Sequence, residues 1–398
     1  MLLSDRKGEI MKIGKQNLFC AWFGLLFVYL ILLYENILGF VITNRRFQLL
    51  YMDLIFAIGV FFLLIFSDYK VSRFIFLNLL FVCTEIVSTV FFNEDVIELI
   101  PNIIYISFWL VVVLICYHSK MILSSSKFLL NIMILSDFIM MASFYVWCLK
   151  GGGYTTAGVN AIYYIICLFP MMFLTDNKII KYAVAVGSFA SVFLAGKRTA
   201  FIALIIAFAV PYLCKMLLSN DKNKIKYMLS LIVISVIAVF LYDYLVGKFN
   251  LMLFERMQNI GTDKGSGRLD IYKAVFSAFN NSNILHKLLG YGYNGVFNCR
   301  IIGTSAHNDF LEILFDYGMI GFLLYLLILG NYIVGGFRLL KSRNNIAYSV
   351  ISTLCVVLIM SLFSHLLLYP TYVIYLLIIL MIGRNELSKK SFKSNIKY

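Results

Sequence analysis

Residues 309–337 read DFLEILFDYGMIGFLLYLLILGNYIVGGF, and this stretch shows what kind of protein the chain is. Its apolar run exceeds the roughly 20 residues that a helix needs to cross a hydrocarbon layer ~30 Å thick. The whole 398-residue chain is 62% hydrophobic and only 14% charged. This composition excludes an ordinary soluble enzyme, and no polar linker is long enough to separate independent cores.

Twelve apolar segments predict an all-α, polytopic integral membrane protein with about 12 transmembrane helices. They cover residues 17–34, 49–66, 74–92, 99–117, 128–149, 161–175, 178–195, 199–217, 227–246, 309–337, 346–369 and 371–383. The count becomes eleven if the sixth and seventh segments form a hairpin that does not fully cross. We expect residues 1–398 to form a single integral membrane domain. Its first apolar block is expected to remain as a span, because no small-residue cleavage site follows it.

The distribution of Lys and Arg predicts the orientation. With the N-terminus inside, the predicted inner segments hold 22 Lys and Arg, whereas the short outer loops hold five. Positive residues are retained on the cytoplasmic side of the bacterial inner membrane, so both termini are expected in the cytoplasm. Residues 247–308 then form the one large extracytoplasmic (periplasmic) loop. The net charge of +14 follows from this bias and does not indicate a nucleic-acid partner.

The eight cysteines do not predict a metal or disulfide site. Most of them lie inside apolar blocks, and none forms a CxxC pair or a zinc-like spacing with histidine. We therefore expect them to be packing residues, and we expect no metal site.

Two of the arginines expected on the outer side, where the orientation rule disfavours basic residues, suggest a binding role. Arg198 lies in the short turn GKRT at 196–199, where its guanidinium can present two donors to a phosphate. It can equally extend to a lipid headgroup, as terminal basic residues often do. Arg268 begins an amphipathic stretch of the outer loop and can meet an anionic headgroup there. The alternative for Arg268 is a solvated loop arginine.

His307 closes the outer loop at the mouth of a predicted span, where an imidazole can exchange a proton near neutral pH. A lone histidine is more often a hydrogen-bonded structural residue. Four further titratable residues lie inside apolar blocks, where burial is costly and indicates a partner or a cavity. They are Asp53, Glu85, Asp137 and His365, and they would suit a proton-coupled transporter.

The glycine-rich stretch GYGYNG at 290–295 is not a dinucleotide fingerprint, because no alternation of strands and helices surrounds it. Its glycines are expected to form tight turns. Tyr291 and Tyr293 offer flat ring faces and hydroxyls of the kind that stack on and bond to sugars.

Three pieces of the sequence resemble the O-antigen polymerase and ligase superfamily of bacterial envelope glycosyltransferases. The turn GKRTA at 196–200 is similar to the family's turn of a small residue, Arg, Thr or Ser, and Ala. Gly267-Arg268 followed by GYGYNG is similar to its large periplasmic loop. His307-Asn308, nine residues, Gly318, two residues and Gly321 are similar to the motif with which that loop re-enters the membrane. Tyr272 stands where the family often has Trp.

The resemblance implies a GT-C-type glycosyltransferase fold that joins sugars outside the cytoplasmic membrane. It implies a polyprenyl diphosphate leaving group and no metal or other cofactor. In this picture Arg198 and Arg268 stabilise negative charge on the departing diphosphate, and His307 accepts or orients the proton of the attacking hydroxyl. Substrate-binding roles fall to Lys197, Tyr272, Tyr291, Tyr293 and Asn308.

The leading hypothesis is an O-antigen or capsular polysaccharide polymerase. It would move a growing glycan from polyprenyl diphosphate to a lipid-linked repeat unit, with the lipid bilayer and a chain-length regulator as further partners. One alternative is an O-antigen ligase that joins the glycan to lipid A core. A second alternative is a lipid-linked sugar flippase or transporter, in which the buried acids and His365 would act.

Overall fold

The computed structural model describes residues 18–28, 45–66, 72–92, 96–119, 127–149, 156–218, 267–366 and 369–395. Within these ranges the secondary structure is helical, with no strand. The span expected at 227–246, the first part of the outer loop (247–266) and the basic segment 1–16 lie outside them.

An apolar helix, Leu18–Val28, precedes the labelled elements. These are α2 (Arg45–Phe66), α3 (Arg73–Phe92), α4 (Val96–His118), α5 (Lys127–Leu149), α6 (Thr156–Leu168), the 3-10 helix η2 (Phe169–Phe173), α7 (Lys178–Leu194), α8 (Arg198–Leu218), α11 (Arg268–Asn281), α12 (Ile284–Leu289), α13 (Gly295–Asn298), α14 (Asp309–Leu340), α15 (Asn345–Phe363) and α16 (Pro370–Asn395).

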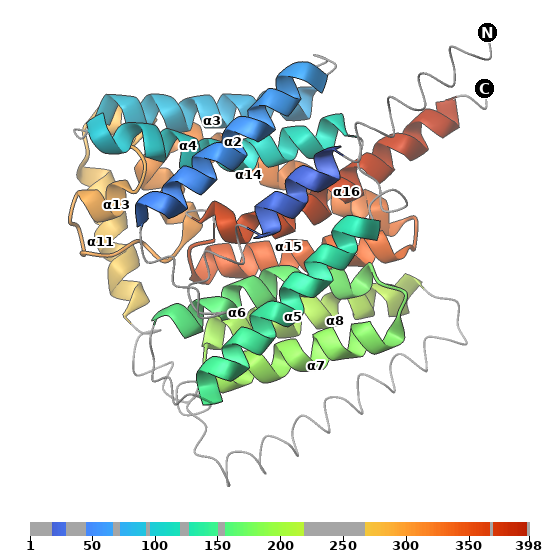
Figure 1. The fold of residues 1–398 in the computed structure, drawn as a ribbon. Helices are drawn as coiled ribbons and strands as arrows, with labels where there is room; N and C mark the ends of the chain where they lie inside the picture. Colours follow the sequence, from blue (N-terminus) through green and yellow to red (C-terminus); the bar gives the residue numbers. More distant parts are fainter. Residues whose placement is uncertain are drawn as a thin grey trace.

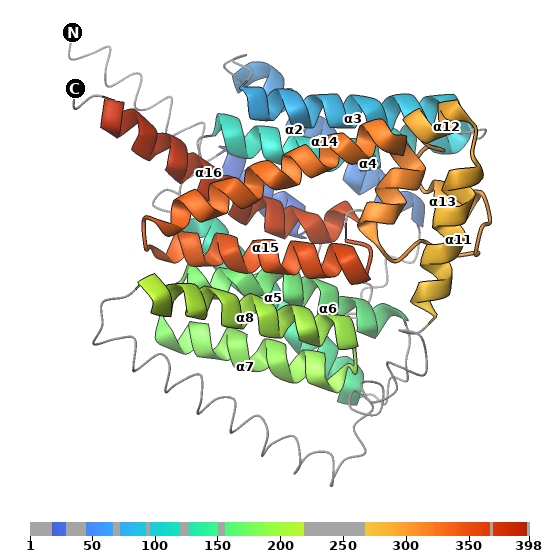
Figure 2. The same cartoon turned by 180° about the vertical axis from the view of Figure 1, so that it is seen from behind.

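The long helices form one bundle with a helical loop region at one end (Figures 1 and 2). α14 packs against α3, and α15 packs against α8, while α16 packs against α4 and α15. The short helices α11, α12 and α13 gather at one end of the bundle, and the C-terminal part of α16 points to the opposite end. The loop region thus lies at the end of the bundle remote from the C-terminal end of α16.

Seven described helices are long and apolar enough to cross a membrane. They are Arg73–Phe92, Leu99–His118, Lys127–Leu149, Arg198–Leu218, Asp309–Leu340, Asn345–Phe363 and Pro370–Lys389. The helical, multi-pass class expected from the sequence is confirmed, whereas the count of twelve stays a prediction. One expected boundary is wrong: the segment 346–369 does not continue as a helix, because α15 ends at Phe363 and Ser364 is extended.

α14 is broken near its start. Gly318 has φ 65° and ψ −169°, which divides the helix into a short arm, Asp309–Tyr317, and a long arm that begins at Met319. A Cβ atom at Gly318 would lie 2.4 Å from the carbonyl carbon of Leu288 in α12. Only glycine combines this backbone conformation with so close a neighbour.

The glycine-rich loop satisfies the carbonyls that the break leaves open. The amide of Tyr291 donates to the Phe315 carbonyl at 3.1 Å, and the amide of Gly292 donates to the Asp316 carbonyl at 2.8 Å. The hydroxyl of Ser88 in α3 donates to the same Asp316 carbonyl at 2.9 Å. Because unsatisfied backbone groups are costly in a membrane protein, these contacts make the break tolerable.

Replacing Gly318 with Ala should destabilise the protein strongly. The backbone strain alone is worth about 1–3 kcal/mol, and the clash with Leu288 adds to it. Gly330 is the matched control, because it lies in the long arm of the same helix and a Cβ there meets nothing within 4 Å. Thermal unfolding in detergent measures both variants. Equal midpoints for Gly318→Ala and Gly330→Ala would contradict the role given to the break.

Candidate functional site

The turn between α7 and α8 presents two basic residues in succession. α7 ends at Leu194, and Gly196 adopts a left-handed conformation with φ 65°. The chain then turns directly into α8, so Lys197 and Arg198 lie at its N-terminus and are half-buried. A helix N-terminus carries unpaired N–H groups and a partial positive charge, which favours anions.

Arg268 joins this turn from the loop region. It begins α11 after Gly267, which is also left-handed. The Arg268 guanidinium donates a hydrogen bond to the Thr199 hydroxyl at 2.9 Å. Thr199 directly follows Arg198, so the two predicted arginines belong to adjoining helix N-termini on the same side of the molecule.

Lys197 also takes part in the site. Its ammonium group lies 3.9 Å from the ring centroid of Tyr163 in α6, a cation–π contact. The Tyr163 hydroxyl in turn accepts a hydrogen bond from Ser364 at 3.4 Å. Tyr163 thus links Lys197 to the segment that follows α15.

Two histidines meet beside these cations. The Nδ1 atoms of His307 and His365 lie 2.9 Å apart, so one ring donates a proton and the other accepts it. Thr304 and Ser305 bracket the pair: the Thr304 hydroxyl lies 3.4 Å from Nε2 of His307, and the Ser305 hydroxyl lies 3.3 Å from Nδ1 of His365. The sequence placed His365 inside a span, which is wrong because α15 stops two residues earlier.

The surroundings keep both imidazoles neutral. Burial lowers the pKa of His307, and the positive charges of Arg268 and Lys197 lower it further. Burial, then His307 and the same two cations, lower the pKa of His365 to about 3. A neutral imidazole has one ring nitrogen with a lone pair, which is the form that a general base needs.

The first turn of α14 holds the histidine segments in place. The Asp309 carboxylate accepts the amide of Leu366, next to His365, at 2.9 and 3.1 Å. The Glu312 carboxylate accepts the amide of Ala306, next to His307. Each acid thus fixes a backbone amide directly beside one histidine. Neither acid was singled out from the sequence, although the i, i+3 spacing in DFLE at 309–312 is visible there.

Two predicted substrate-binding residues, Asn308 and Tyr272, also hold the segments around the histidines in place. The Asn308 side chain caps α14 by accepting the amide of Leu311 at 3.1 Å, and it donates to the Leu362 carbonyl at 2.9 Å. The Tyr272 hydroxyl lies 3.2 Å from the carbonyls of both His307 and Leu362 and can donate to either. Their polar atoms thus join α11, α14 and the end of α15.

The two tyrosines of the glycine-rich loop differ. The Tyr291 ring is stacked between His286 and Phe315, at centroid distances of 3.9 and 4.5 Å, so protein rings cover both of its faces. Tyr291 is therefore not placed to stack on a sugar. Tyr293 lines a cavity and lies 5.8 Å, centroid to centroid, from Tyr105. The tight turns expected here are present, with φ 81° at Gly290 and 83° at Gly292.

The site residues from the α7–α8 turn to His307 fall in one region with known relatives. Residues 183–326 match the family model described as O-antigen ligase. The match supports the O-antigen polymerase and ligase superfamily for this part of the chain. The resemblance stated from the sequence is thereby confirmed at the level of the superfamily. A comparison with curated proteins gives no significant match. His365 lies beyond the O-antigen ligase region, although it contacts His307 within it.

The histidine pair should make the protein less stable in acid. Between pH 6.5 and about 3 the unfolded chain binds a proton that folded His365 refuses, so the free energy of unfolding falls as the pH decreases through this window. Thermal unfolding of the wild type and of the His307→Gln/His365→Gln variant, measured from pH 7 to pH 4, tests this. The wild type should lose more of its unfolding temperature; parallel curves would contradict the depressed pKa values.

Asp309→Ala should loosen the segment that carries His365. The variant leaves the buried Leu366 amide without its acceptor, at a cost of about 1–3 kcal/mol, whereas Asp309→Asn keeps one acceptor oxygen. Histidine NMR provides the specific readout. In Asp309→Ala the pKa of His365 should rise towards its ordinary value of 6.5, with a smaller rise in Asp309→Asn. An unchanged titration in a destabilised Asp309→Ala protein would show that Asp309 does not position the histidine.

Proposed function

We propose that this protein is an O-antigen or capsular polysaccharide polymerase. It would transfer a growing glycan from polyprenyl diphosphate to the non-reducing end of a lipid-linked repeat unit, on the outer side of the cytoplasmic membrane. The observation that carries this proposal is that the His307–His365 pair lies within electrostatic range of Lys197 and Arg268, in and beside a region that matches an O-antigen ligase family model. Base and anion site then lie side by side, as glycosyl transfer from a lipid diphosphate requires.

The cations suit the leaving group. When the bond between the anomeric carbon and the diphosphate breaks, the bonding electrons leave with the diphosphate and its negative charge grows. Arg198, Arg268 and Lys197 are proposed to stabilise this charge, aided by the N-termini of α8 and α11. Three fixed positive groups can do this without a divalent ion, so we propose a metal-independent reaction.

The histidines suit the attacking group. A hydroxyl oxygen of the acceptor sugar bonds to the anomeric carbon, and its proton must pass to a base. His307 is the proposed base, and His365 would orient its ring through the contact between the Nδ1 atoms. General bases of this kind contribute about 10²–10⁴-fold to rate.

The proposal extends to the architecture. A single domain over residues 1–398, about 12 spans, a GT-C-type fold and both termini in the cytoplasm fit the seven candidate spans and the loop region at one end of the bundle. The substrate would be a polyprenyl-diphosphate-linked oligosaccharide taken from the bilayer. A chain-length regulator is a proposed partner.

A ligase is the second candidate, because the matching family model is described as O-antigen ligase. It would use the same residues and take lipid A core as acceptor. A deletion strain separates the two functions. Without a polymerase one repeat unit is still attached to lipid A core, whereas without a ligase none is.

Alanine substitutions at Arg198, Arg268 and His307 should each stop chain extension, because each removes a charge or base used in the transfer step. Loss of one preorganised charge-stabilising donor costs about 10²–10³-fold in rate. The measurement is the glycan ladder on gels, at matched protein levels in the membrane. Each variant should leave single repeats or short capsule, and normal ladders from all three would exclude the proposal.

Arg268→Lys is the finer control. Lysine keeps the positive charge but loses the planar fork that binds a phosphate through two hydrogen bonds. The ladder should therefore be shortened but not abolished in this variant. Full loss in both Arg268→Lys and Arg268→Ala would mean that geometry rather than charge is limiting.

A further inference from the structure

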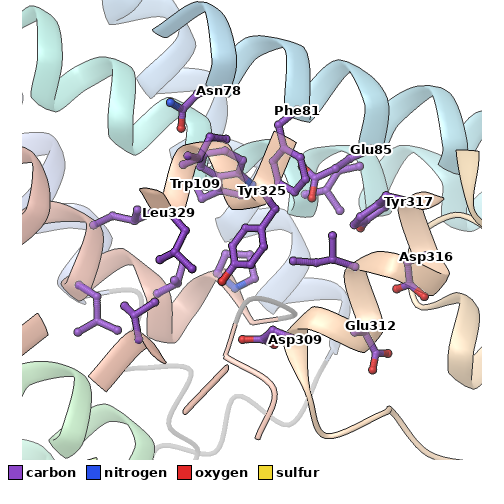
Figure 3. Close-up of a pocket in the computed structure, with 18 of the residues that line it drawn as sticks. Asn78, Phe81, Glu85, Trp109, Asp309, Glu312, Asp316, Tyr317, Tyr325 and Leu329 are labelled. Carbon is purple, nitrogen blue, oxygen red and sulfur yellow. The ribbon is translucent and has the colours of Figure 1, made fainter. Parts of the chain in front are cut away.

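A cavity lies between α3, α4, α14, α15 and α16 (Figure 3). It comprises about 990 Å³ of space between atoms, including the part open at its mouth. Its inner end is aliphatic, with lining residues such as Ile328, Leu329 and Leu380. Its outer end, lined by the short arm of α14 and by Tyr293 of the glycine-rich loop, is polar.

The outer end is acidic and aromatic. Three carboxyl groups from the short arm of α14 form one wall, and Glu85 of α3 lies across from them (Figure 3). Tyr105, Trp109 and Tyr293 contribute aromatic rings. No Lys, Arg or His is among the described residues that line the cavity. A diphosphate would meet only acids and rings here, so it belongs with the cations near Thr199 instead.

Several buried oxygens of this polar wall have no hydrogen-bond partner among the described residues. Oε2 of Glu85, Oε1 of Glu312 and Oδ2 of Asp316 have no hydrogen-bond partner within the described structure, although all three side chains are at least nine-tenths buried. The opposite oxygens of two of them already bind the loop, Glu312 at the Ala306 amide and Asp316 at the Val296 amide. Buried acceptors without donors are costly. A ligand that brings several O–H groups would satisfy them.

Tyr369 lies between the cavity and His365. Its ring centroid lies 5.2 Å from that of His365, and the next residue, Pro370, lines the cavity. Burial raises the pKa of Tyr369, and the charge of Glu312 raises it further, so the hydroxyl stays protonated and able to donate. The proposed base and the acidic wall are therefore neighbours.

We propose that the outer end of this cavity binds the acceptor sugar, an uncharged and hydroxyl-rich carbohydrate. This inference rests on the proposed glycosyl transfer and assigns its second substrate to a place. Sugar hydroxyls donate to the open oxygens of Glu85, Glu312 and Asp316, while ring faces pack on Trp109 and Tyr293. The donor diphosphate stays with the cations, and the histidines lie between the two substrates.

The binding test uses the fluorescence of Trp109, one of only three tryptophans in the chain. The probe is the repeat-unit oligosaccharide released from its carrier, added to the purified full-length protein. Quenching by the oligosaccharide that disappears in Trp109→Phe supports the assignment. Quenching by a polyprenol without phosphate, and not by the oligosaccharide, would make the cavity a lipid site and overturn it.

The kinetic test uses Glu85→Gln. The side chain keeps one acceptor oxygen and replaces the other with an NH₂ group, so one open acceptor is lost with little change in shape. KM for the acceptor should rise about tenfold, with kcat and KM for the donor unchanged. Asp137→Asn is the matched control, since Asp137 is a buried carboxyl group on α5 that is not among the cavity residues, and it should leave the acceptor KM unchanged.

The outcomes separate this inference from the proposed function. Suppose that Arg268→Ala stops transfer and Glu85→Gln leaves the KM for the acceptor unchanged. The acceptor site would then be refuted, and the polymerase proposal would stand. Normal transfer by all three alanine variants, at Arg198, Arg268 and His307, would refute the polymerase proposal itself. The fluorescence titration measures binding without turnover, so it still decides between a sugar and a lipid occupant in that case.

Discussion

A helix that breaks inside a membrane protein must have its open carbonyls bound by other donors, and this requirement organises the end of the bundle where the loop region lies. The break at Gly318 exposes the carbonyls of Phe315 and Asp316, which the glycine-rich loop and Ser88 then bind. The loop approaches so closely only because Gly290 and Gly318 have no side chains. The short arm of α14 is thereby fixed in position, and its polar face with it.

The short arm of α14 positions the histidines of the proposed active site. Two of its acids, Asp309 and Glu312, each bind a backbone amide beside a histidine, so the segments before α14 and after α15 come together at one point. The cations come from other elements, namely the α7–α8 turn and the first residue of α11. The same arm also turns its acids toward the cavity. One local distortion thus contributes to both proposed substrate compartments.

The sequence predicted the helical membrane class, the turns at Gly290 and Gly292, and the arginines that prove to lie at adjoining helix ends. These features depend on composition and local conformation, which are readable along the chain. It did not predict the partner of His307, because His365 sits in an apolar stretch that looks like an uninterrupted span. It also proposed the ring of Tyr291 for stacking on a sugar, because the packing of Phe315 on that ring cannot be read from the sequence. Contacts of this kind depend on tertiary structure and leave no periodic signal.

The meeting of His307 and His365 has a consequence for how the functional unit is delimited. The O-antigen ligase region ends at residue 326, whereas the second imidazole lies after the whole of α15. A fragment cut to the homologous segment would keep the basic turn, the loop and His307, but would lose the ring that shares its proton. The smallest piece of this chain able to hold the complete pair therefore extends past the C-terminal end of α15, well beyond the boundary that homology draws.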